Sequence, residues 1–569
     1  MEKSAIVGVL EEMAVLMELH GENPFKVRAF QNGARVLETF EGDVAAAVAN
    51  GELKQVKGIG AGLFADIRSL VETGGLPVYE KLKAETPAGL LEMLSIPGLG
   101  PKKIKAIHEG LGISSVGELE YACLENRLVD LPGFGEKTQT KILKSLEFWK
   151  KHRGRFLYAE ALPVAQALEA AIARMPGVER VVIAGSLRRK AETVKDVDLV
   201  AVASHATAVM AAFVSLPDVE QITGQGETKS SVRLKNGLNV DLRVFAAEDF
   251  AYGLLHFTGS QAFNTTLRQR AKARGLKLNE YGLWRDEERL PASEESDILA
   301  HLDLPYLPPE LREDRGEIAE AEAGRVPVLV TDQDLLGVFH VHTHASDGEA
   351  SVRDMALRAR ALGYKYIGIS DHSASAVYAR GLTAERLAEQ QSEIRALNEE
   401  LDGITILSGV EADILADGAL DYDEAILARL DFVIGSVHSR FGQDRAQMTA
   451  RLVRAVSHPQ LTMLGHLTGR LLLSREAYEF DLEAVLQAAV KHGKIVELNA
   501  NPHRLDIDWR DLKRVRELGL QIAINPDAHS LKGLEDTRFG VAVARKGGIR
   551  AEDVFNAQSL EVVTARLRQ

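Results

Sequence analysis

Cysteine is nearly absent from this sequence, which has Cys123 as the single cysteine in 569 residues. No disulfide can therefore form within the chain. The chain also lacks any run of about 18 apolar residues, so the sequence predicts no membrane span. Its first residues, MEKSAIVGVLEEM, mix acids with apolar residues and lack the regions of a signal peptide. Together these absences predict a cytoplasmic protein.

An excess of positive charge is missing as well. Lys and Arg number 68 against 82 Asp and Glu, which gives a net charge of −14. This balance argues against a nonspecific nucleic-acid coat protein, which is usually basic. It does not exclude a DNA enzyme, because such an enzyme needs only local cationic contacts and its metal sites demand clustered acids. With 46% hydrophobic residues, the chain has material for several cores, and its length predicts about three to five domains.

Four stretches of different character follow one another along the chain. Residues 1–150 have apolar residues at helical spacing, and residues 155–285 alternate short β-rich runs with helical patterns. Residues 286–336 are acidic and contain several prolines, which is typical of a linker or a surface wrap. From residue 337 onward, apolar strand-like runs alternate with helices, and this order predicts a parallel sheet or barrel.

A glycine motif occurs three times in the N-terminal region. VKGIGAGL, IPGLGPKK and LPGFGEKT each place an apolar residue between two glycines, ahead of a helix-like stretch. Glycine allows a positive φ, and the amides that open the next helix favour a phosphate. The motifs resemble the helix-hairpin-helix elements of DNA repair proteins, which hold the DNA backbone without reading its sequence. The alternative is three ordinary helix connections capped by glycine. The DNA-binding residues predicted from these motifs are Gly58, Gly60, Gly98, Gly100, Lys102, Gly133, Gly135 and Lys137.

Closely spaced carboxylates mark the β-rich stretch. Asp196 and Asp198 are two residues apart in DVDLVA, so both face the same side of a strand. Asp241 in NVDLRVF suits a neighbouring strand as the third acid. Three carboxylates around two Mg²⁺ or Mn²⁺ ions form the clamp of in-line phosphoryl transfer. A pair of aspartates alone is common on protein surfaces, so the prediction depends on the third acid and on the Gly-Ser pair that precedes them.

Residues around these acids suit a bound nucleotide. Gly185 and Ser186 would open a helix toward the phosphates, and Arg189 suits a phosphate clamp. GSLRRKAETVKDVDLVA, GETKSSVRL and HFTGSQAFNTTLRQRAKARGLKLNEYGL resemble the palm and nucleotide-binding region of family X DNA polymerases, relatives of polymerase beta. The resemblance implies that dNTPs are added to gapped or primed duplex DNA in short-gap repair, with Asp196, Asp198 and Asp241 as catalytic residues. It implies nucleotide-binding roles for Gly185, Ser186, Arg189, Phe257, Gly259, Asn264 and Arg268.

Two positions depart from the family pattern. The family usually has Tyr-Phe before Thr-Gly-Ser, whereas this sequence has His256-Phe257, which leaves the exclusion of ribonucleotides open. Animal relatives carry a Schiff-base lysine in the helix after the first hairpin, and here Asp66 stands near that position. We therefore expect no deoxyribose-phosphate lyase activity of that kind.

Histidines and acids gather in the last part of the sequence. Nearly all of them directly follow a strand-like run, such as KYIGIS before His372 and DFVIGSV before His438. In a parallel β/α barrel, groups at the C-terminal strand ends converge on one mouth. Imidazole and carboxylate ligands suit Zn²⁺, Mn²⁺ or Fe²⁺. One histidine alone is more often structural, but six with three acids predict a metal centre.

The order HxH…D, DH, E, H, H and DxH resembles the PHP (polymerase and histidinol phosphatase) family. His344 lies between ligand positions and matches none of them. After a family X polymerase, the resemblance implies a metal-dependent 3′→5′ exonuclease or 3′-end-processing phosphodiesterase. It implies up to three metal ions held by His340, His342, Asp347, His372, Glu411, His438, His466, Asp527 and His529.

The sequence thus predicts a multidomain chain with an all-α helix-hairpin-helix N-terminal region, an α/β nucleotidyltransferase palm and a C-terminal distorted, seven-stranded parallel β/α barrel of the PHP type. We expect a monomer. The predicted parts are an 8-kDa-like DNA-binding domain (1–85), a fingers-like helix-hairpin-helix domain (86–155), the palm (156–245), a thumb-like nucleotide-selection subdomain (246–300), a linker (301–336) and the PHP domain (337–569).

Two other functions compete with this prediction. One is a small-molecule phosphatase fused to an inactive palm, which the complete set of palm acids disfavours. The other is a noncatalytic DNA scaffold, which would have an empty C-terminal barrel and no nucleotide incorporation.

Overall fold

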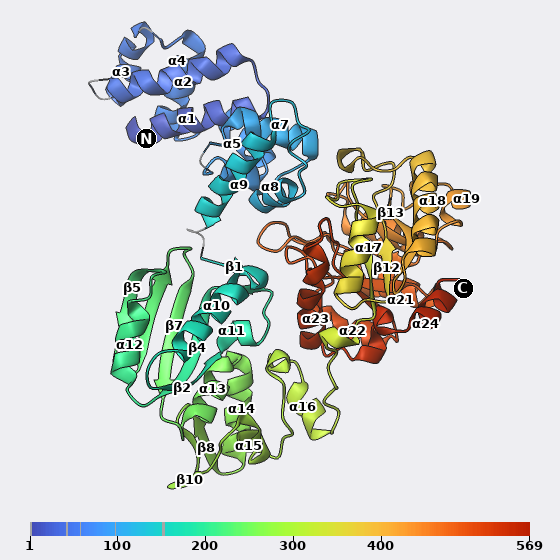
Figure 1. Cartoon of the computed structure of the whole chain (residues 1–569). Helices are drawn as coiled ribbons and strands as arrows, with labels where there is room; N and C mark the ends of the chain where they lie inside the picture. The colour runs from blue at the N-terminus through green and yellow to red at the C-terminus, as the bar shows by residue number, and fades with distance from the viewer. Residues whose placement is uncertain are drawn as a thin grey trace. The chain divides into compact units, whose positions relative to one another are not determined.

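The computed structural model describes residues 3–40, 42, 44–56, 58–96, 98–150 and 154–568. Lys57 and Pro97 of the first two glycine motifs lie outside the described residues. The chain divides into two compact units, Met1–Trp149 and Lys150–Gln569, which are described separately (Figure 1). None of the described helices is both long and apolar enough to cross a bilayer.

The first unit is all helical, as predicted. Its periodic apolar residues point inward: Ile6, Leu10 and Met13 of the first helix are buried in one core, and Ile104 and Ile107 lie in a second. Its helices are α1 (Lys3–Leu19), α2 (Pro24–Thr39), α3 (Val44–Ala49), η1 (Glu52–Gln55), α4 (Ala61–Thr73), α5 (Pro77–Glu85), α6 (Ala88–Met93), α7 (Pro101–Leu111), α8 (Val116–Leu124) and α9 (Glu136–Lys150).

The second unit begins with the predicted palm, a mixed sheet of five strands in the order β2-β4-β7-β6-β5. β4 and β7 are parallel neighbours, and the other pairs are antiparallel. Alternate residues of β4 and β7, among them Val197, Leu199, Val240 and Leu242, are fully buried in the core. The elements are β1 (Phe156–Leu157), α10 (Tyr158–Ala173), β2 (Val178–Ile183), α11 (Gly185–Arg188), β3 (Thr193–Val194), β4 (Asp196–Ala203), α12 (Ala206–Val214), β5 (Val219–Gln225), β6 (Lys229–Leu234) and β7 (Asn239–Phe245).

A smaller α/β subdomain follows the palm. Its core includes Leu302, Leu304 and Leu307, so the beginning of the segment predicted as a linker packs into this subdomain. Farther along, the amide of Val330 donates to the carbonyl of Ile549, and the segment therefore wraps onto the barrel. The elements are α13 (Phe250–Thr258), α14 (Gln261–Ala273), β8 (Leu276–Asn279), β9 (Gly282–Arg285), β10 (Glu288–Leu290), α15 (Glu295–Ala300), η2 (Pro309–Leu311), α16 (Glu317–Glu322) and η3 (Asp332–Asp334).

The predicted barrel has seven parallel strands in the order β11 to β17. A parallel bridge between Val341 and Ala528 joins the last strand region to the first and nearly closes the barrel. Each strand is buried along most of its length, which explains the continuous apolar runs in the sequence. The strands are β11 (Gly337–Val341), β12 (Tyr366–Ile369), β13 (Thr405–Asp413), β14 (Phe432–Ser436), β15 (Met463–Leu464), β16 (Ile495–Asn499) and β17 (Ile522–Asn525).

Helices surround these strands and alternate with most of them along the chain (Figure 1). They are α17 (Val352–Ala361), η4 (Val377–Ala379), α18 (Ala384–Glu400), α19 (Glu424–Leu427), α20 (Arg445–Val456), α21 (Leu482–Lys491), α22 (Trp509–Glu517), η5 (Gly533–Asp536), α23 (Thr537–Lys546), η6 (Ala551–Asp553), η7 (Phe555–Ala557) and α24 (Leu560–Leu567).

Candidate functional site

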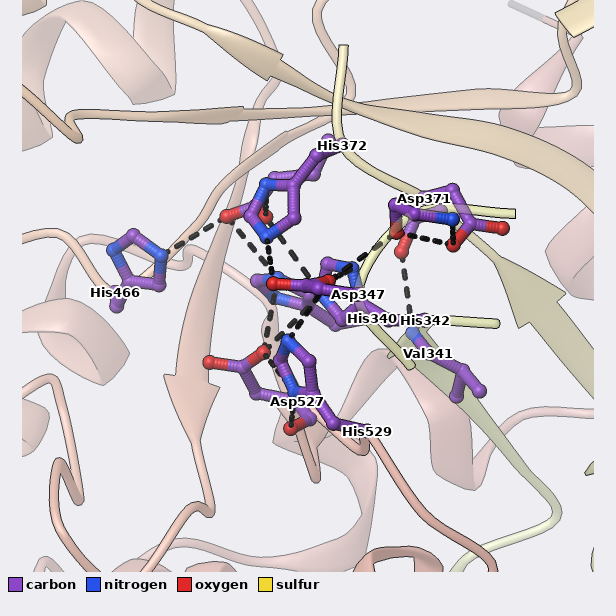
Figure 2. A network of polar contacts seen from close by, with 12 residues as sticks. His340, Val341, His342, Asp347, Asp371, His372, His466, Asp527 and His529 are labelled. Atoms are coloured by element: carbon purple, nitrogen blue, oxygen red, sulfur yellow. Dashed lines mark hydrogen bonds and ion pairs between the residues drawn. The ribbon is translucent and has the colours of Figure 1, made fainter. Parts of the chain in front are cut away.

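The C-terminal ends of the barrel strands bring the nine predicted PHP ligands to one centre (Figure 2). Four groups of side chains lie close enough to hold a metal ion each, and some residues belong to two groups. The groups are His342, Asp347, His372 and His529; His340, His466 and Asp527; His340, His342 and Glu411; and His372, Glu411 and His438. His344 is exposed and belongs to none of these groups, which agrees with its omission from the predicted ligands.

Glu411 lies at the middle of this centre. Its Oε1 is 2.9 Å from His466 Nε2 and 3.2 Å from Nε2 of both His340 and His438. Its Oε2 is 3.0 Å from His372 Nδ1. One buried carboxylate therefore contacts imidazoles from four separate chain segments.

Asp347 organises the other side of the centre. Its Oδ1 is 3.4 Å from His529 Nε2, and its Oδ2 is 3.5 Å from His372 Nε2. The rings of His342 and His529 are stacked with centroids 4.2 Å apart. Asp527 Oδ1 lies 3.2 Å from His342 Nε2, which joins this side to the rest of the centre.

Backbone strain accompanies one of the four groups. His340, His466 and Asp527 have φ values of 56°, 25° and 51°, a region that residues with a side chain rarely adopt. Such strain persists only where the surroundings enforce it, and it concentrates at functional sites. The fold therefore holds these three side chains in place at a cost in backbone energy.

Burial and charge set the protonation of this centre. Burial alone would raise the pKa of the Glu411 carboxyl, but the imidazoles of His438, His340 and His372 hold it well below its ordinary value. Burial, with the neighbouring His529 and His372, lowers the pKa of His342 to about 4. Burial would lower the pKa values of His340, His372 and His438, but neighbouring carboxylates raise them, so without a metal these imidazoles favour their protonated forms. A bound metal ion would displace these protons.

Unsatisfied polar atoms indicate that this centre suits metal ions. His340 Nε2, both ring nitrogens of His342, Asp347 Oδ2 and Glu411 Oε2 are buried and have no hydrogen-bond partner among the described residues. Buried polar atoms normally have hydrogen-bond partners, so several unpartnered nitrogen and oxygen atoms in one centre need an explanation. A group of imidazole nitrogens and carboxylate oxygens without thiolates fits divalent transition-metal ions.

A second layer of side chains, which the sequence analysis did not identify, orients these ligands. Glu497 on β16 accepts from His340 Nδ1 at 2.5 Å and from the amide of His466 at 2.7 Å. Asp413 lies 2.6 Å from His438 Nδ1. Such partners fix the ring orientation of a ligating histidine. The available signal was a charged residue inside the apolar run KIVELNA, where a purely structural strand would have none.

The palm acids lie side by side on two neighbouring parallel strands, β4 and β7. Asp198 on β4 is directly opposite Asp241 on β7, and Asp196 is two residues earlier on β4. Lys229 Nζ lies 2.9 Å from Asp241 Oδ2, and an Arg243 nitrogen lies 3.7 Å from the same oxygen. Among the described residues, the three palm acids do not form a cluster as tight as the groups of histidines and acids in the barrel.

Mutual repulsion acts on these acids. Burial, followed by the charges of Asp196 and Asp241, raises the pKa of Asp198 to about 6. Burial and Asp241 raise the pKa of Asp196 as well. Burial and the neighbouring acids disfavour the ionised forms of these carboxyls. A bound metal cation would favour the ionised forms, so the cluster suits a metal site.

The predicted glycine-serine turn opens α11 at Gly185, as expected. Gly185 has φ +62°, and a Cβ at this position would lie 2.2 Å from Asp198 Oδ2. Only glycine therefore lets this turn approach the palm acids so closely. Arg189 directly after α11 donates to Glu313 Oε1 at 3.0 Å and to the carbonyl of Thr258 at 2.5 Å, so its guanidinium is held beside Gly259.

The remaining predicted nucleotide contacts lie on α13 and α14. Arg243 packs over the Phe257 ring at 4.0 Å from its centroid. Asn264 donates to the carbonyl of His256 at 2.7 Å, and both line a small cavity together with Arg268. His256 stands where the family usually has a tyrosine. Burial lowers the pKa of His256, so its imidazole favours the neutral form.

The three glycine motifs share one conformation. The first glycine of each has a positive φ, +104° at Gly58 and +85° at both Gly98 and Gly133. In each motif the apolar residue is buried while both glycines are exposed, and its amide donates to the carbonyl three residues earlier. Gly60 and Gly100 are the N-caps of α4 and α7, and Gly135 directly precedes α9. Lys102 and Lys137 are exposed at the starts of α7 and α9.

Family models match four parts of the chain. A helix-hairpin-helix domain matches residues 1–76, a SAM-like helix-hairpin-helix tandem matches 90–147, a DNA polymerase beta thumb matches 253–313 and a PHP domain matches 339–501. The thumb match extends into the segment predicted as a linker, in agreement with the packing of Leu302, Leu304 and Leu307.

Known proteins resemble the whole chain or its barrel. The DNA polymerase/3′-5′ exonuclease PolX of Bacillus subtilis (strain 168) is 39% identical over 573 residues, which cover 100% of both chains. A probable phosphatase of Thermoanaerobacter sp. (strain X514) is 28% identical over 38% of this chain and 90% of its own length. A probable phosphatase of Caldicellulosiruptor saccharolyticus is 32% identical over 33% of this chain and 78% of its own.

The fold and the two sites define a class of protein in which a polymerase beta-type nucleotidyltransferase precedes a PHP barrel on one chain. With a relative that is 39% identical from end to end, the chain belongs to the family X DNA polymerases that carry a C-terminal PHP domain. The predicted family and fold class are thereby confirmed.

Proposed function

We propose that this protein is a DNA-directed DNA polymerase that fills short gaps during DNA repair, including base excision repair, and that its barrel is a metal-dependent 3′→5′ exonuclease. The observation that carries the proposal is the presence of two separate acid-rich centres on one chain that belongs to this family. Its full-length relative is named for both activities. The proposed partners are gapped or primed duplex DNA and dNTPs, and the proposed state is a cytoplasmic monomer.

In the palm, Asp196, Asp198 and Asp241 would hold two Mg²⁺ or Mn²⁺ ions. Such ions supply charge neutralisation for the attacking and leaving oxygens of an in-line displacement. The strand register supports this role, because Asp198 and Asp241 are lateral neighbours and Asp196 shares the face of Asp198. Lys229 would exchange its contact with Asp241 for the substrate's negative charge when the site fills.

Nucleotide recognition is assigned to the segments around the palm acids. Gly185 and Ser186 would accommodate the triphosphate, and Arg189 would contact it. Phe257 and Gly259 would pack against the sugar, while Asn264 would contact the minor-groove edge of the nascent pair and Arg268 the template strand. The cavity shared by Asn264 and Arg268 supports a common role for those two residues.

The helical unit would hold the DNA backbone. The exposed glycines of its three motifs leave room for a phosphate, since nothing lies within 4 Å of a Cβ at Gly60, Gly100, Gly133 or Gly135. Lys102 and Lys137 would add charge that weakens with salt.

The barrel would hold up to three Zn²⁺, Mn²⁺ or Fe²⁺ ions through its nine predicted ligands. Such ions supply an activated water and stabilise charge on a phosphate under attack. The chain's part is to keep His342 neutral, Glu411 ionised and the rings aligned through Glu497 and Asp413. The expected substrate is a DNA 3′ end.

The named relatives of the barrel alone favour one second candidate, a phosphatase acting on small phosphomonoesters. Hydrolysis of histidinol phosphate without shortening of DNA ends would support it.

One labelled gapped duplex tests both proposed activities. It is incubated with and without dNTPs, in Mg²⁺ and in Mn²⁺, and extension and 3′ shortening are measured on the same gel. Extension with dNTPs and shortening without them are expected. A primer that stays unchanged under all four conditions would contradict the proposal.

A further inference from the structure

A cavity of about 310 Å³ lies between the connecting segment and the outside of the barrel. One wall comes from residues around η2 and α16, and the other comes from α22 and the end of α23. None of the predicted metal ligands lines it, although Glu313 of its lining pairs with Arg189 of the proposed nucleotide site. Its volume is in the range of sites for small ligands.

One face of α22 supplies a row of side chains to this cavity. Trp509, Lys513 and Arg516 are four and three residues apart, which places them on one side of the helix. The opposite wall adds Arg315 and Arg325. In a chain of net charge −14, this concentration of cations around a single tryptophan is unusual.

The carboxylates of the lining already have partners. Glu317 accepts from the amides of Asp314 and Arg315, both at 2.7 Å. Glu320 accepts from Arg325 at 2.8 Å, and Glu313 accepts from Arg189 and pairs with Lys546. The acids therefore leave little capacity to bind a cation.

In the part of the chain that the structure describes, two of the cations that line the cavity are not held by a carboxylate or a carbonyl group. Arg315 and Lys513 are exposed and make no ion pair among the described residues, and the guanidinium of Arg315 lies 5.3 Å from the centre of the Trp509 ring. The pKa of Glu320 is lowered, mainly by its hydrogen bond with Arg325 and further by the charges of Lys513 and Arg516. These two charges of α22 thus lie close enough to the opposite wall of the cavity to act on the Glu320 carboxylate.

Apolar side chains also line the cavity. They are Leu307, Leu311, Val326 and Pro327, and the glycines at the end of α23 lie beside them. A purely inorganic anion would make no use of these side chains. A ligand that combines a flat apolar ring with a phosphate would contact both the apolar side chains and the cations.

We propose that this cavity binds a nucleoside phosphate, with the phosphate on Lys513 and Arg315 and the base among Trp509 and the apolar side chains. The shared chemistry is an aromatic base joined to a phosphate. A free nucleotide and one unit of a single DNA strand both supply it, and the test separates these two sources.

Trp509 offers a local signal. The chain has three tryptophans, so replacing Trp149 and Trp284 by Phe leaves emission from the cavity alone. Thymidine monophosphate, inorganic phosphate and a five-residue thymidine oligonucleotide are titrated separately in EDTA, which keeps metal-dependent binding at the two catalytic centres silent. Calorimetry on the chain with all three tryptophans provides the same affinities if the Phe substitutions unfold it.

Neighbouring residues of α22 provide a matched pair of variants. Lys513→Ala should weaken nucleotide binding by about tenfold, because a hydrogen bond to a charged group is lost. Arg514→Ala removes an equal charge from a residue that pairs with Glu483 outside the cavity, and its effect should stay below about twofold.

The expected result is a saturable change in Trp509 emission with thymidine monophosphate, at least about tenfold weaker with phosphate, and weakened by Lys513→Ala. Tighter binding of the oligonucleotide that is also weakened by Lys513→Ala would identify a DNA strand as the source. Equal affinity for the mononucleotide and the oligonucleotide would identify the free nucleotide. Absence of saturable binding, equal binding of phosphate and nucleotide, or indifference to Lys513→Ala would overturn the proposal.

Discussion

The two proposed metal centres of this chain are built in different ways. In the barrel, Glu411 and its histidines are buried at the ends of adjacent strands, and a second layer of Glu497 and Asp413 holds the rings. In the palm, Asp196 is exposed, Asp198 has a raised pKa, and Asp241 is occupied by Lys229.

The two centres differ in what holds their side chains in place. A nearly closed barrel fixes its ligands through the fold itself, so the barrel centre is preorganised. The palm acids repel one another, and Asp241 pairs with the Lys229 ammonium where a metal ion is proposed, so their final geometry awaits substrate and metal. Substitutions in the barrel should therefore act on bound metal, whereas those in the palm should act on turnover.

The substitution with the largest expected effect on this comparison is Glu411→Gln. Glu411 belongs to two of the four ligand groups, and an amide cannot replace its charge. We expect nuclease activity to fall by about 10³-fold or more, with loss of bound metal by elemental analysis and polymerase activity unchanged. Retention of full metal content would contradict the assignment of Glu411 as a ligand.

A buried ion pair beside the palm allows the next test. Arg188, directly after the Gly185 turn, contacts Glu295 at 2.7 Å, and the fully buried Arg312 contacts the same carboxylate at 2.6 Å. Burial would raise the pKa of Glu295, but Arg312 and Arg188 hold it at about 2, below its ordinary 4.5. Glu295→Gln should therefore lower the free energy of unfolding of this region by about 3 kcal/mol at pH 7.

The pH dependence of that loss has a defined sign. Because the folded-state pKa is depressed, the stabilisation is complete above about pH 4.5 and disappears as the pH falls toward 2. Urea unfolding followed by Trp284, in a chain whose other tryptophans are Phe, measures it. A difference between variant and parent that stays constant from pH 7 to pH 3 would show that folding does not shift the pKa of Glu295, and would contradict the proposed ion pairs.

Glu497→Gln tests whether the barrel centre is preorganised. The substitution removes the carboxylate that orients His340 while leaving every predicted ligand in place. Metal affinity should fall about 10- to 100-fold, and added metal should restore nuclease activity. Glu483→Gln on the exposed face of α21 serves as the control, and equal effects of the two substitutions would refute the role of Glu497.

The smallest expected effect concerns the helical unit. Lys102→Ala should weaken binding to gapped DNA several-fold and reduce the salt slope by about one, without changing turnover at saturating DNA. Lys81→Ala on α5, away from the glycine motifs, is the matched control. If DNA affinity depends on salt in the same way for both variants, the second hairpin is not part of the DNA-binding surface.

Much of this architecture follows from local sequence. Strand-like runs followed by His372, His438 or Asp527 predict a ligand at a strand end, and the barrel brings them together. Positive φ at Gly58, Gly98 and Gly133 follows from the repeated motif. These features depend on spacing within a few residues, which the sequence displays directly.

Features that join distant segments could not be predicted in the same way. The pair of Arg470 with Glu192 spans 278 residues, and no spacing rule connects them. The acids and prolines of residues 286–336 predict a linker or a surface wrap, yet Leu302, Leu304 and Leu307 pack into the thumb core. A few isolated leucines in a polar stretch have no periodicity that would reveal this burial.

The most direct test of two independent centres compares Asp198→Ala with His342→Ala on the same labelled gapped duplex. The account predicts that Asp198→Ala loses dNTP addition and keeps 3′ shortening, whereas His342→Ala keeps addition and loses shortening. If either substitution abolishes both activities in a chain that remains folded, the two centres do not work separately and the account is contradicted.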